Sequence, residues 1–279
     1  MFIYISMSEV RKIYCDTRYK TLDSNNDSDF SIELERNIEL SDQTKIYIDD
    51  IVLPISYNTV DFRNNKVYIK LTAGLLSTNY NFTIANNNYT GDSLAIELEL
   101  LINATIAPFL NKPTVIVSYD LIQNIFKISF TDSRAEAIKT STPMILEFLT
   151  DSELKTLYQL DQANTINTII RNTRGIKILE NTPYSCYIDL VQTRNIYLTS
   201  STLSNYDVLA NFPVSNIIKK IPVAVPVNSL LIYSTGNAVD YITVSRRSIK
   251  KIDFQLRDTK NRIIDLQNNH WSFSLNFIN

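Results

Sequence analysis

Apolar and polar residues alternate in several segments of this chain, and such alternation predicts strands that bury one face. The clearest runs are residues 30–35, 67–71, 252–257 and 271–277. In the last run the apolar positions are Trp271, Phe273, Leu275 and Phe277, and the positions between them are polar. A period of two over so many segments is typical of antiparallel sheet.

Further segments rich in Ile, Val, Tyr and Phe are expected to form strands. They are residues 44–57, 184–191, 194–200, 217–225 and 228–234. Pro222 and Pro226 predict that the fourth of these lies at a sheet edge or ends early, because proline cannot donate a backbone hydrogen bond. Runs of Asn separate many segments, and Asn can adopt the left-handed conformation that turns require.

The middle of the chain has a different pattern. A helix is predicted by the helical spacing of four apolar residues, Leu94, Leu98, Leu101 and Ile102. Asp92 is expected to cap the start of this helix. A β-hairpin is expected next, with strands at 115–119 and 126–130. A second, short helix is predicted by the capping box Thr150–Glu153.

Strand candidates on both sides of a mixed segment predict a β domain that carries an insertion. We expect a mainly β protein, a single jelly-roll β-sandwich formed by residues 1–72 and 184–279, with an N-terminal arm at about 1–20. The insertion, residues 73–183, is expected to be an α+β unit made of a helix, a β-hairpin and a short second helix. Another Greek-key sandwich would give the same pattern, so the jelly roll is the preferred of two architectures.

The composition excludes several classes of function. The chain has 27 Lys and Arg against 29 Asp and Glu, so no strong net charge draws it to nucleic acid or to a membrane surface. His270 is the only histidine, so neither a histidine-rich metal site nor a two-histidine oxygenase site can form. The four glycines form no phosphate-binding motif. No segment reaches the ~20 apolar residues that span a bilayer, and no membrane span is expected.

Few residues are candidates for a chemical site. The acidic turn Asp23–Asp29 resembles the start of a calcium loop, but Ser28 stands where such loops have glycine and Leu34 where they have glutamate. A polar turn is therefore expected there. Asp49 and Asp50 lie within a predicted strand, where neighbouring side chains point to opposite faces and converge only at a bulge.

A catalytic role for His270 would require a nucleophile and an orienting carboxylate, and the sequence indicates neither. Cys15 and Cys186 are expected to be buried, reduced thiols. We therefore expect no enzyme, no catalytic, cofactor-binding or metal-binding residue, and no cofactor. A glycosidase with two carboxylates stays formally open, but no feature selects a pair.

Two basic clusters, Lys219-Lys220 and Arg246-Arg247 with Lys250-Lys251, are candidates for contact with phosphate or an acidic partner. Because charge is balanced elsewhere, solvated strand ends explain them better. The N-terminal arm is also basic, with Arg11, Lys12, Arg18 and Lys20 against Glu9 and Asp16. We expect it to reach inward or sideways and to contact neighbouring molecules.

Segments in three parts of the chain have the order and spacing of a known family. The first part comprises Tyr14–Thr21, Asp29–Leu34 and Ile46–Asn58. The second comprises Asn88–Leu94, Val117–Asp120 and Ile125–Ile128. The third comprises Ile196–Tyr206, Asn216–Val223, Ile252–Asp258, Ile264–Leu266 and Trp271–Leu275. In these segments the chain resembles the penton (minor capsid) proteins of virophages, Polinton-like viruses and related double-jelly-roll viruses.

The resemblance implies a structural virion protein and no reaction. Such a penton occupies the fivefold vertices of an icosahedral capsid, where five copies close a ring through heterologous contacts. The implied partners are further copies of the chain, a double-jelly-roll major capsid protein, and other minor capsid or cement proteins. The implied location is the capsid vertex of a virion that is assembled inside the host cell, and no specific nucleic acid is implied.

A second class of function is also open. A jelly roll with an insertion can serve as the receptor- or carbohydrate-binding module of a viral spike or fibre. The Tyr- and Asn-rich loops at Asn79–Tyr89 would then hold the binding site. Specific binding of the isolated protein to host cells or glycans would favour this alternative.

Overall fold

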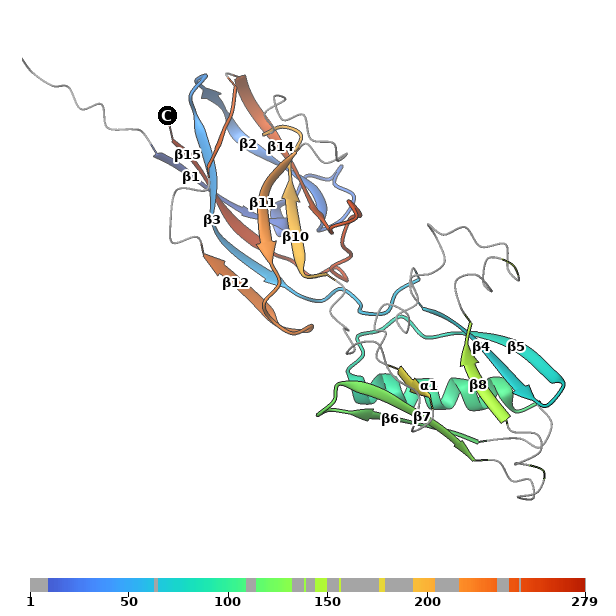
Figure 1. Cartoon of the computed structure of the whole chain (residues 1–279). Helices are drawn as coiled ribbons and strands as arrows, with labels where there is room; N and C mark the ends of the chain where they lie inside the picture. The colour runs from blue at the N-terminus through green and yellow to red at the C-terminus, as the bar shows by residue number, and fades with distance from the viewer. Residues whose placement is uncertain are drawn as a thin grey trace, which may run out of the picture. The chain divides into compact units, whose positions relative to one another are not determined.

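The computed structural model describes residues 10–62, 65–108, 114–131, 138, 144–149, 156, 176–178, 193–203, 216–234, 241–245 and 247–278. The chain divides into two units (Figure 1). One consists of residues 1–57 and 193–279, and the other of residues 58–192. Each unit has its own cluster of buried apolar residues.

Two antiparallel sheets form the first unit. One has the order β1-β15-β3-β12, and the short strand β13 (Ile242–Thr243) also pairs with β3. Its main strands are β1 (Val10–Asp16), β3 (Lys45–Pro54), β12 (Leu230–Ser234) and β15 (Ser272–Ile278). The other sheet has the order β11-β10-β14-β2. Its strands are β2 (Asp29–Leu40), β10 (Asn195–Thr199), β11 (Ile217–Pro222) and β14 (Arg247–Arg257).

The order of these strands is that of a jelly roll. Counted along the chain, the main strands are β1, β2, β3, β10, β11, β12, β14 and β15. The first sheet contains the first, eighth, third and sixth of them, and the second contains the fifth, fourth, seventh and second. Every connection except the one from β10 to β11 therefore crosses from one sheet to the other, which is the double Greek key. The second unit is inserted in the connection from β3 to β10.

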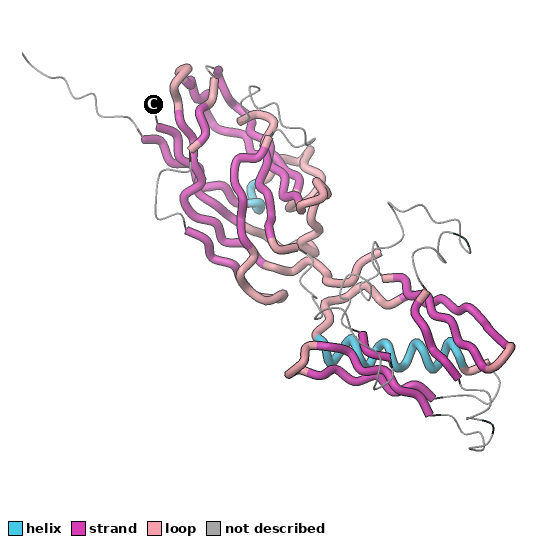
Figure 2. The backbone as a smooth tube through the Cα atoms, in the orientation of Figure 1, coloured by secondary structure: helices cyan, strands magenta, loops and turns pink. Residues whose placement is uncertain are grey.

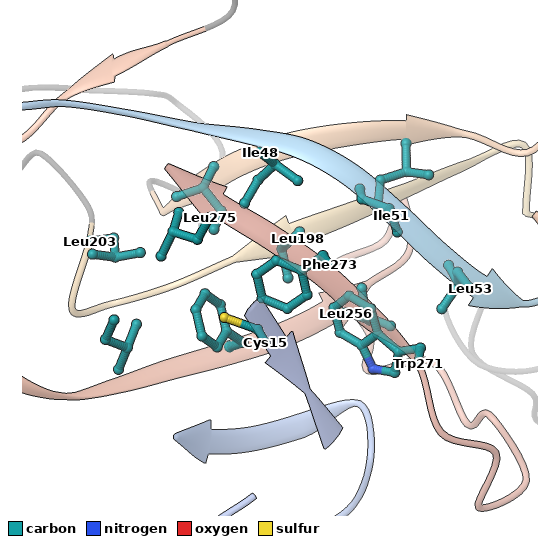
Figure 3. Packing of buried hydrophobic residues seen from close by; sticks show 14 of the residues in the cluster. Cys15, Ile48, Ile51, Leu53, Leu198, Leu203, Leu256, Trp271, Phe273 and Leu275 are labelled. Atoms are coloured by element: carbon teal, nitrogen blue, oxygen red, sulfur yellow. The ribbon is translucent and has the colours of Figure 1, made fainter. Parts of the chain in front are cut away.

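Aromatic rings fill the centre of the sandwich. The Phe273 ring stacks on Trp271 and meets Phe254 edge-on, with 4.9 Å between ring centroids in both pairs. Phe30 lies edge-on to Trp271 at 5.7 Å. Figure 3 shows Phe273 and Trp271 together with aliphatic residues of both sheets. Because the inward positions of each sheet supply these side chains, the strict alternation in the sequence corresponds directly to this core.

Among its described residues, the inserted unit contains one long helix and two small sheets (Figure 2). One sheet has the order β5-β4-β8, with β4 (Lys66–Ala73), β5 (Leu76–Thr83) and β8 (Met144–Phe148). The other has the order β6-β7-β9, with β6 (Thr114–Asp120), β7 (Ile125–Thr131) and β9 (Ile176–Ile178). The pair β7–β9 is parallel, and the other pairs of this unit are antiparallel.

The helix α1 (Gly91–Ile106) begins with a reciprocal cap. Thr90 Oγ1 accepts a hydrogen bond from the Ser93 backbone N–H at 3.2 Å, and Ser93 Oγ accepts one from the Thr90 N–H at 2.9 Å. The prediction that Asp92 caps this helix is wrong. Asp92 lies in the first turn, where its negative charge interacts favourably with the helix dipole. Threonine and serine at the correct spacing satisfy the first free N–H groups and so determine the start.

Side chains of α1 also complete the edge of β6. Asn103 donates to the Val115 carbonyl at 2.8 Å and accepts from the Val115 N–H at 2.7 Å, as a neighbouring strand would. Glu99 accepts from the Val117 N–H at 2.9 Å. The predicted apolar stripe of the helix, including Leu94 and Leu98, is buried in the core of this unit. In the described part of the chain, no helix is long and apolar enough to cross a bilayer.

The mainly β fold and the jelly roll are confirmed. The alternating segments form β2, β4, β14 and β15, and the predicted hairpin forms β6 and β7. Pro222 ends β11, which is an edge strand, as predicted. Turns with Asn in the left-handed region are also present, at Asn124, Asn228, Asn261 and Asn268. The predicted strand at 184–191 and the capping box Thr150–Glu153 lie outside the described residues.

Three segments differ from the expectation. Residues 10–16 of the expected arm form the edge strand β1, which pairs with β15 along its whole length. The strand at 66–73, expected in the jelly roll with a boundary at 72/73, lies in the inserted unit because it pairs with β5 and β8. Part of the expected loop region Asn79–Tyr89 belongs to β5. The returning boundary falls at 192/193, where 183/184 was expected.

Phe254→Ala is expected to lower the free energy of unfolding by about 3–5 kcal/mol, because it removes a fully buried ring and leaves a cavity. Urea unfolding followed by tryptophan fluorescence measures this, since Trp271 belongs to the same core. The control is Leu22→Ala in the same unit, at a fully exposed position, with an expected change within about 0.5 kcal/mol. Equal effects of the two substitutions would contradict the described core.

Candidate assembly surface

The edge strand β12 exposes apolar residues on the outer face of its sheet. Leu230 and Ile232 are 53% and 72% exposed. They pair with Pro54 and Val52 of β3, and the residue between them, Leu231, is buried. Since paired residues share a face and neighbours alternate, the four side chains lie together on the face away from the core. We call these four residues, Val52, Pro54, Leu230 and Ile232, the apolar edge patch.

The sequence around β12 is uncharged. No charged residue occurs between Lys220 and Asp240. Edge strands of natural sheets usually carry charges, prolines or bulges that prevent pairing with another chain. β12 is regular from Leu230 to Ser234, and no strand of the described residues pairs with its outer side. It therefore offers both apolar side chains and backbone hydrogen-bonding groups to a partner.

The opposite edge of the same sheet, β1, is ionic. Lys12 Nζ lies 2.7 Å from Asp49 Oδ2, and Arg18 Nη2, just after the strand, lies 2.6 Å from Asp16 Oδ2. The sheet thus has one uncharged edge and one charged edge. Two different edges suit a heterologous contact, in which different surfaces of two copies meet and repeated contacts close a ring.

A β-bulge turns Asp49 and Asp50 toward the same face. The register between β3 and β15 shifts here, so the buried residues Ile48 and Ile51 stand three positions apart instead of two. Strict alternation, which would separate the two carboxylates, is broken at this point. Asp49 pairs with Lys12, and Asp50 Oδ1 is buried without a hydrogen-bond partner among the described residues. The pair is a polar feature of the outer face of this sheet.

The acidic turn does not assemble a calcium site. Asp23 pairs with Lys251, whose hydrogen bond lowers the pKa of Asp23 to about 2. Asp27 is buried and pairs with Lys20 at 2.9 Å. Asp29 accepts from the side chains of Asn25 and Gln255. Each carboxylate has a different partner, and the described residues contain no group of three or more potential metal ligands.

His270 connects the turn after β1 to the start of β15. Its Nδ1 lies 3.3 Å from Thr17 Oγ1 and 3.2 Å from Asp27 Oδ1. A catalytic relay needs one ring nitrogen for the nucleophile and the other for the carboxylate, whereas here one nitrogen faces both. Trp271 strengthens the same junction by donating from Nε1 to the Asp27 carbonyl at 2.6 Å. The contacts of His270 are therefore those of a structural residue.

Cys15 is a buried free thiol, and burial raises its pKa to about 12. A thiol with so high a pKa is protonated and unreactive at neutral pH. The prediction of a buried, reduced thiol is confirmed for Cys15. Cys186 lies outside the described residues.

Two lysines of the basic clusters form ion pairs within the chain. Lys250 pairs with Glu33 at 2.7 Å, and Lys251 pairs with Asp23. Lys219 is not a solvated strand end: it is buried, and its Nζ lies 5.2 Å from the centre of the Tyr233 ring. This cation–π contact links β11 to β12 at the edge of the sandwich. Arg246 lies outside the described residues.

Asp253 anchors the beginning of the connection from β10 to β11. Its carboxylate accepts hydrogen bonds from the backbone N–H groups of Ser201 at 2.9 Å and Thr202 at 2.7 Å, and from the Thr202 hydroxyl. Burial raises the pKa of Asp253, but these hydrogen bonds together lower it by more than burial raises it. The net pKa is therefore below the usual value. This carboxylate therefore holds residues 201–202 against β14.

The arrangement of strands and insertion defines the protein as a jelly-roll protein with an α+β unit between its third and fourth strands. The whole chain is similar in structure to the penton protein of mavirus, with a TM-score of 0.55 over 97% of this chain and 99% of the other, at 9% sequence identity. A chain from the Sputnik virophage structure matches over 96% of this chain and 97% of its own length, with a TM-score of 0.44 and 12% identity. No family model and no curated protein sequence matches. The resemblance to penton proteins is confirmed at the level of the fold.

Sequence reasoning missed the apolar edge patch. Its apolar residues look like ordinary strand residues, and only the pairing of β12 with β3 shows that they lie on the outer face of a sheet edge. One signal was available: the absence of charge between Lys220 and Asp240 in a chain with 20% charged residues. The bulge at Asp49 could also be found, because the apolar spacing from Ile48 to Ile51 is too long for strict alternation.

Asp253→Asn is expected to lower the free energy of unfolding by about 1–3 kcal/mol at pH 7, because it weakens charge-assisted hydrogen bonds. The native pKa lies below the unfolded value of about 3.9, so this contribution is fully present above that value and is lost as pH falls through the native pKa. Urea unfolding at pH 7 and at pH 3 measures both effects. Glu35→Gln, at an exposed position of β2, is the control. A difference between wild type and Asp253→Asn that stays constant with pH would contradict this role.

Proposed function

We propose that this chain is a structural virion protein, the penton that forms the fivefold vertices of an icosahedral capsid. The observation that carries the proposal is the match in fold to the mavirus penton protein over nearly the full length of both chains, which includes the jelly roll and the insertion. An agreement in only the sandwich would support much less, because jelly rolls serve many functions.

The two edges of the β1-β15-β3-β12 sheet support a ring. Five copies around an axis must meet through two different surfaces, one on each side of the subunit. One edge of this sheet is apolar and uncharged, and the other is ionic. In the proposed ring the jelly-roll unit makes the contacts between copies and with a double-jelly-roll major capsid protein, while the inserted unit forms an outer or lateral feature.

The inserted unit supports a second candidate function, binding of a host receptor or glycan. β5 is an edge strand whose residues from Leu76 to Asn79 are all exposed. No charged residue occurs between Lys70 and Asp92, a segment rich in Asn, Thr and Tyr. Such side chains suit recognition of a polar, uncharged ligand. This function and the penton function are compatible within one vertex.

Co-expression with the partner major capsid protein is expected to give closed particles with density for this chain at every fivefold vertex. Imaging at a resolution that separates the two units of the chain measures this, and particles assembled without the chain are the control. In the control, the vertices are expected to be open. Closed particles that lack this chain at the vertices, or that carry it as a protruding fibre, would overturn the penton proposal.

A further inference from the structure

We propose that residues 2–6 of one copy add as an extra strand to the free edge of β12 in the neighbouring copy. This inference rests on the proposed function, since it names the contact that would join copies in the ring. The partner is thus a second copy of this chain, and the occupant of the edge is its segment Phe2–Ser6. Residues 1–9 lie outside the described residues.

The sequence of this segment suits a strand that is covered on both faces. Met1–Ser8 contains no charged side chain, and Phe2, Ile3, Tyr4 and Ile5 are four consecutive residues with high strand propensity. A strand that is apolar on both faces gains stability only where both faces are in contact with protein. Three residues, Met7–Glu9, separate the segment from β1, whose first residue, Val10, lies at a sheet edge.

β12 offers apolar neighbours on both faces. On the outer face, a strand added to β12 would lie beside Leu230 and Ile232 of the apolar edge patch. On the inner face it would lie beside Leu231 and Tyr233, which belong to or pack against the core. The added strand would also pair with backbone groups of β12 that no described strand uses. This mode of recognition is strand addition to a sheet edge.

The strand next to the donor segment and the acceptor strand lie at opposite edges of one sheet, an arrangement that suits a ring of copies. The donor segment follows from β1, and the acceptor is β12, at the opposite edge of the same sheet. A contact between them in different copies is heterologous, so each copy gives one strand and receives one. Pairing of one edge with itself would need the same edge on both copies, and β1 and β12 differ in charge and in apolar character. A reciprocal exchange of segments between two copies would instead give a cross-linked dimer.

Disulfide trapping in assembled particles tests the pairing directly. Each residue from Phe2 to Ser6 is changed to Cys in turn and combined with Ile232→Cys, in full-length protein that carries Cys186→Ser; Cys15 is buried and stays. We expect at least one combination to give a ladder of cross-linked chains that ends at the pentamer on a denaturing gel. The matched control replaces Ile232→Cys by Ile96→Cys, at a position of α1 that is 63% exposed. Only intrachain cross-links, or none in any combination, would overturn the proposal.

A charge at the acceptor edge gives an independent test. Ile232→Lys is expected to reduce the amount of this chain in particles by about tenfold or more, because the lysine opposes burial of the added strand. Ile96→Lys should have no such effect. Thermal unfolding of the isolated Ile232→Lys protein should be unchanged, since this side chain is 72% exposed. Equal incorporation of the two lysine variants would contradict strand addition at β12.

Removal of residues 1–9 completes the comparison. If the segment and the β12 edge form one contact, the deletion and Ile232→Lys each abolish it, and the two changes together reduce incorporation no further than either alone. If the double change reduces incorporation by the product of the two separate factors, the segment and the β12 edge make separate contacts, and the proposal is overturned. The two proposals can be contradicted separately. Density for this chain at the vertices without any cross-link would contradict only the strand addition. Wild-type particles without density for this chain at the vertices would contradict the penton function as well.

Discussion

The position of β15 between β1 and β3 is the constraint on which the sandwich depends. It joins the two ends of the described chain, since Val10 pairs with Ile278 and Asp16 with Ser272. β1 has no other strand partner among the described residues, so it is part of the sheet only when β15 is in place. The inward residues of β15 also supply the centre of the core. Formation of this sheet is therefore a long-range event, which makes the sandwich cooperative and slow to fold relative to a helical protein.

The insertion is compatible with this sheet because its two ends meet. Tyr57, where the chain leaves the jelly roll, donates a hydrogen bond from its hydroxyl to the Thr193 carbonyl, where the chain returns, at 3.1 Å. Burial of the Tyr57 ring raises the pKa of its hydroxyl to about 12, so the donor is protonated at neutral pH. The loop between β3 and β10 is thus closed at its base, and the inserted unit forms a core of its own instead of sharing that of the sandwich.

Strands with one buried and one exposed face were predictable, and strands without that contrast were not. β15 follows strict alternation and was predicted within one residue at each end, and the alternating run 252–257 gave the second half of β14. β1 was missed because Cys15 is its only fully buried residue, and β5 because both of its faces are largely exposed. The sequence also did not tell to which unit a strand belongs, since the alternation in β4 shows a buried face but not which core covers it. The outward pair Asp49–Asp50 lies at a bulge, and the three-residue spacing from Ile48 to Ile51 was the sequence signal for it.

Two edge strands of this chain illustrate two ways to treat unpaired backbone groups. At β6, the chain uses its own helix: Asn103 and Glu99 satisfy the groups of Val115 and Val117 that a further strand would use. At β12, the described residues provide no such cover, and the sequence has none of the charges that protect an exposed edge. A lysine at Ile232 would provide that protection without loss of core packing, because the side chain points outward. An edge that is costly for an isolated chain, and that a single substitution would protect, is most simply explained as a surface that is covered when copies assemble.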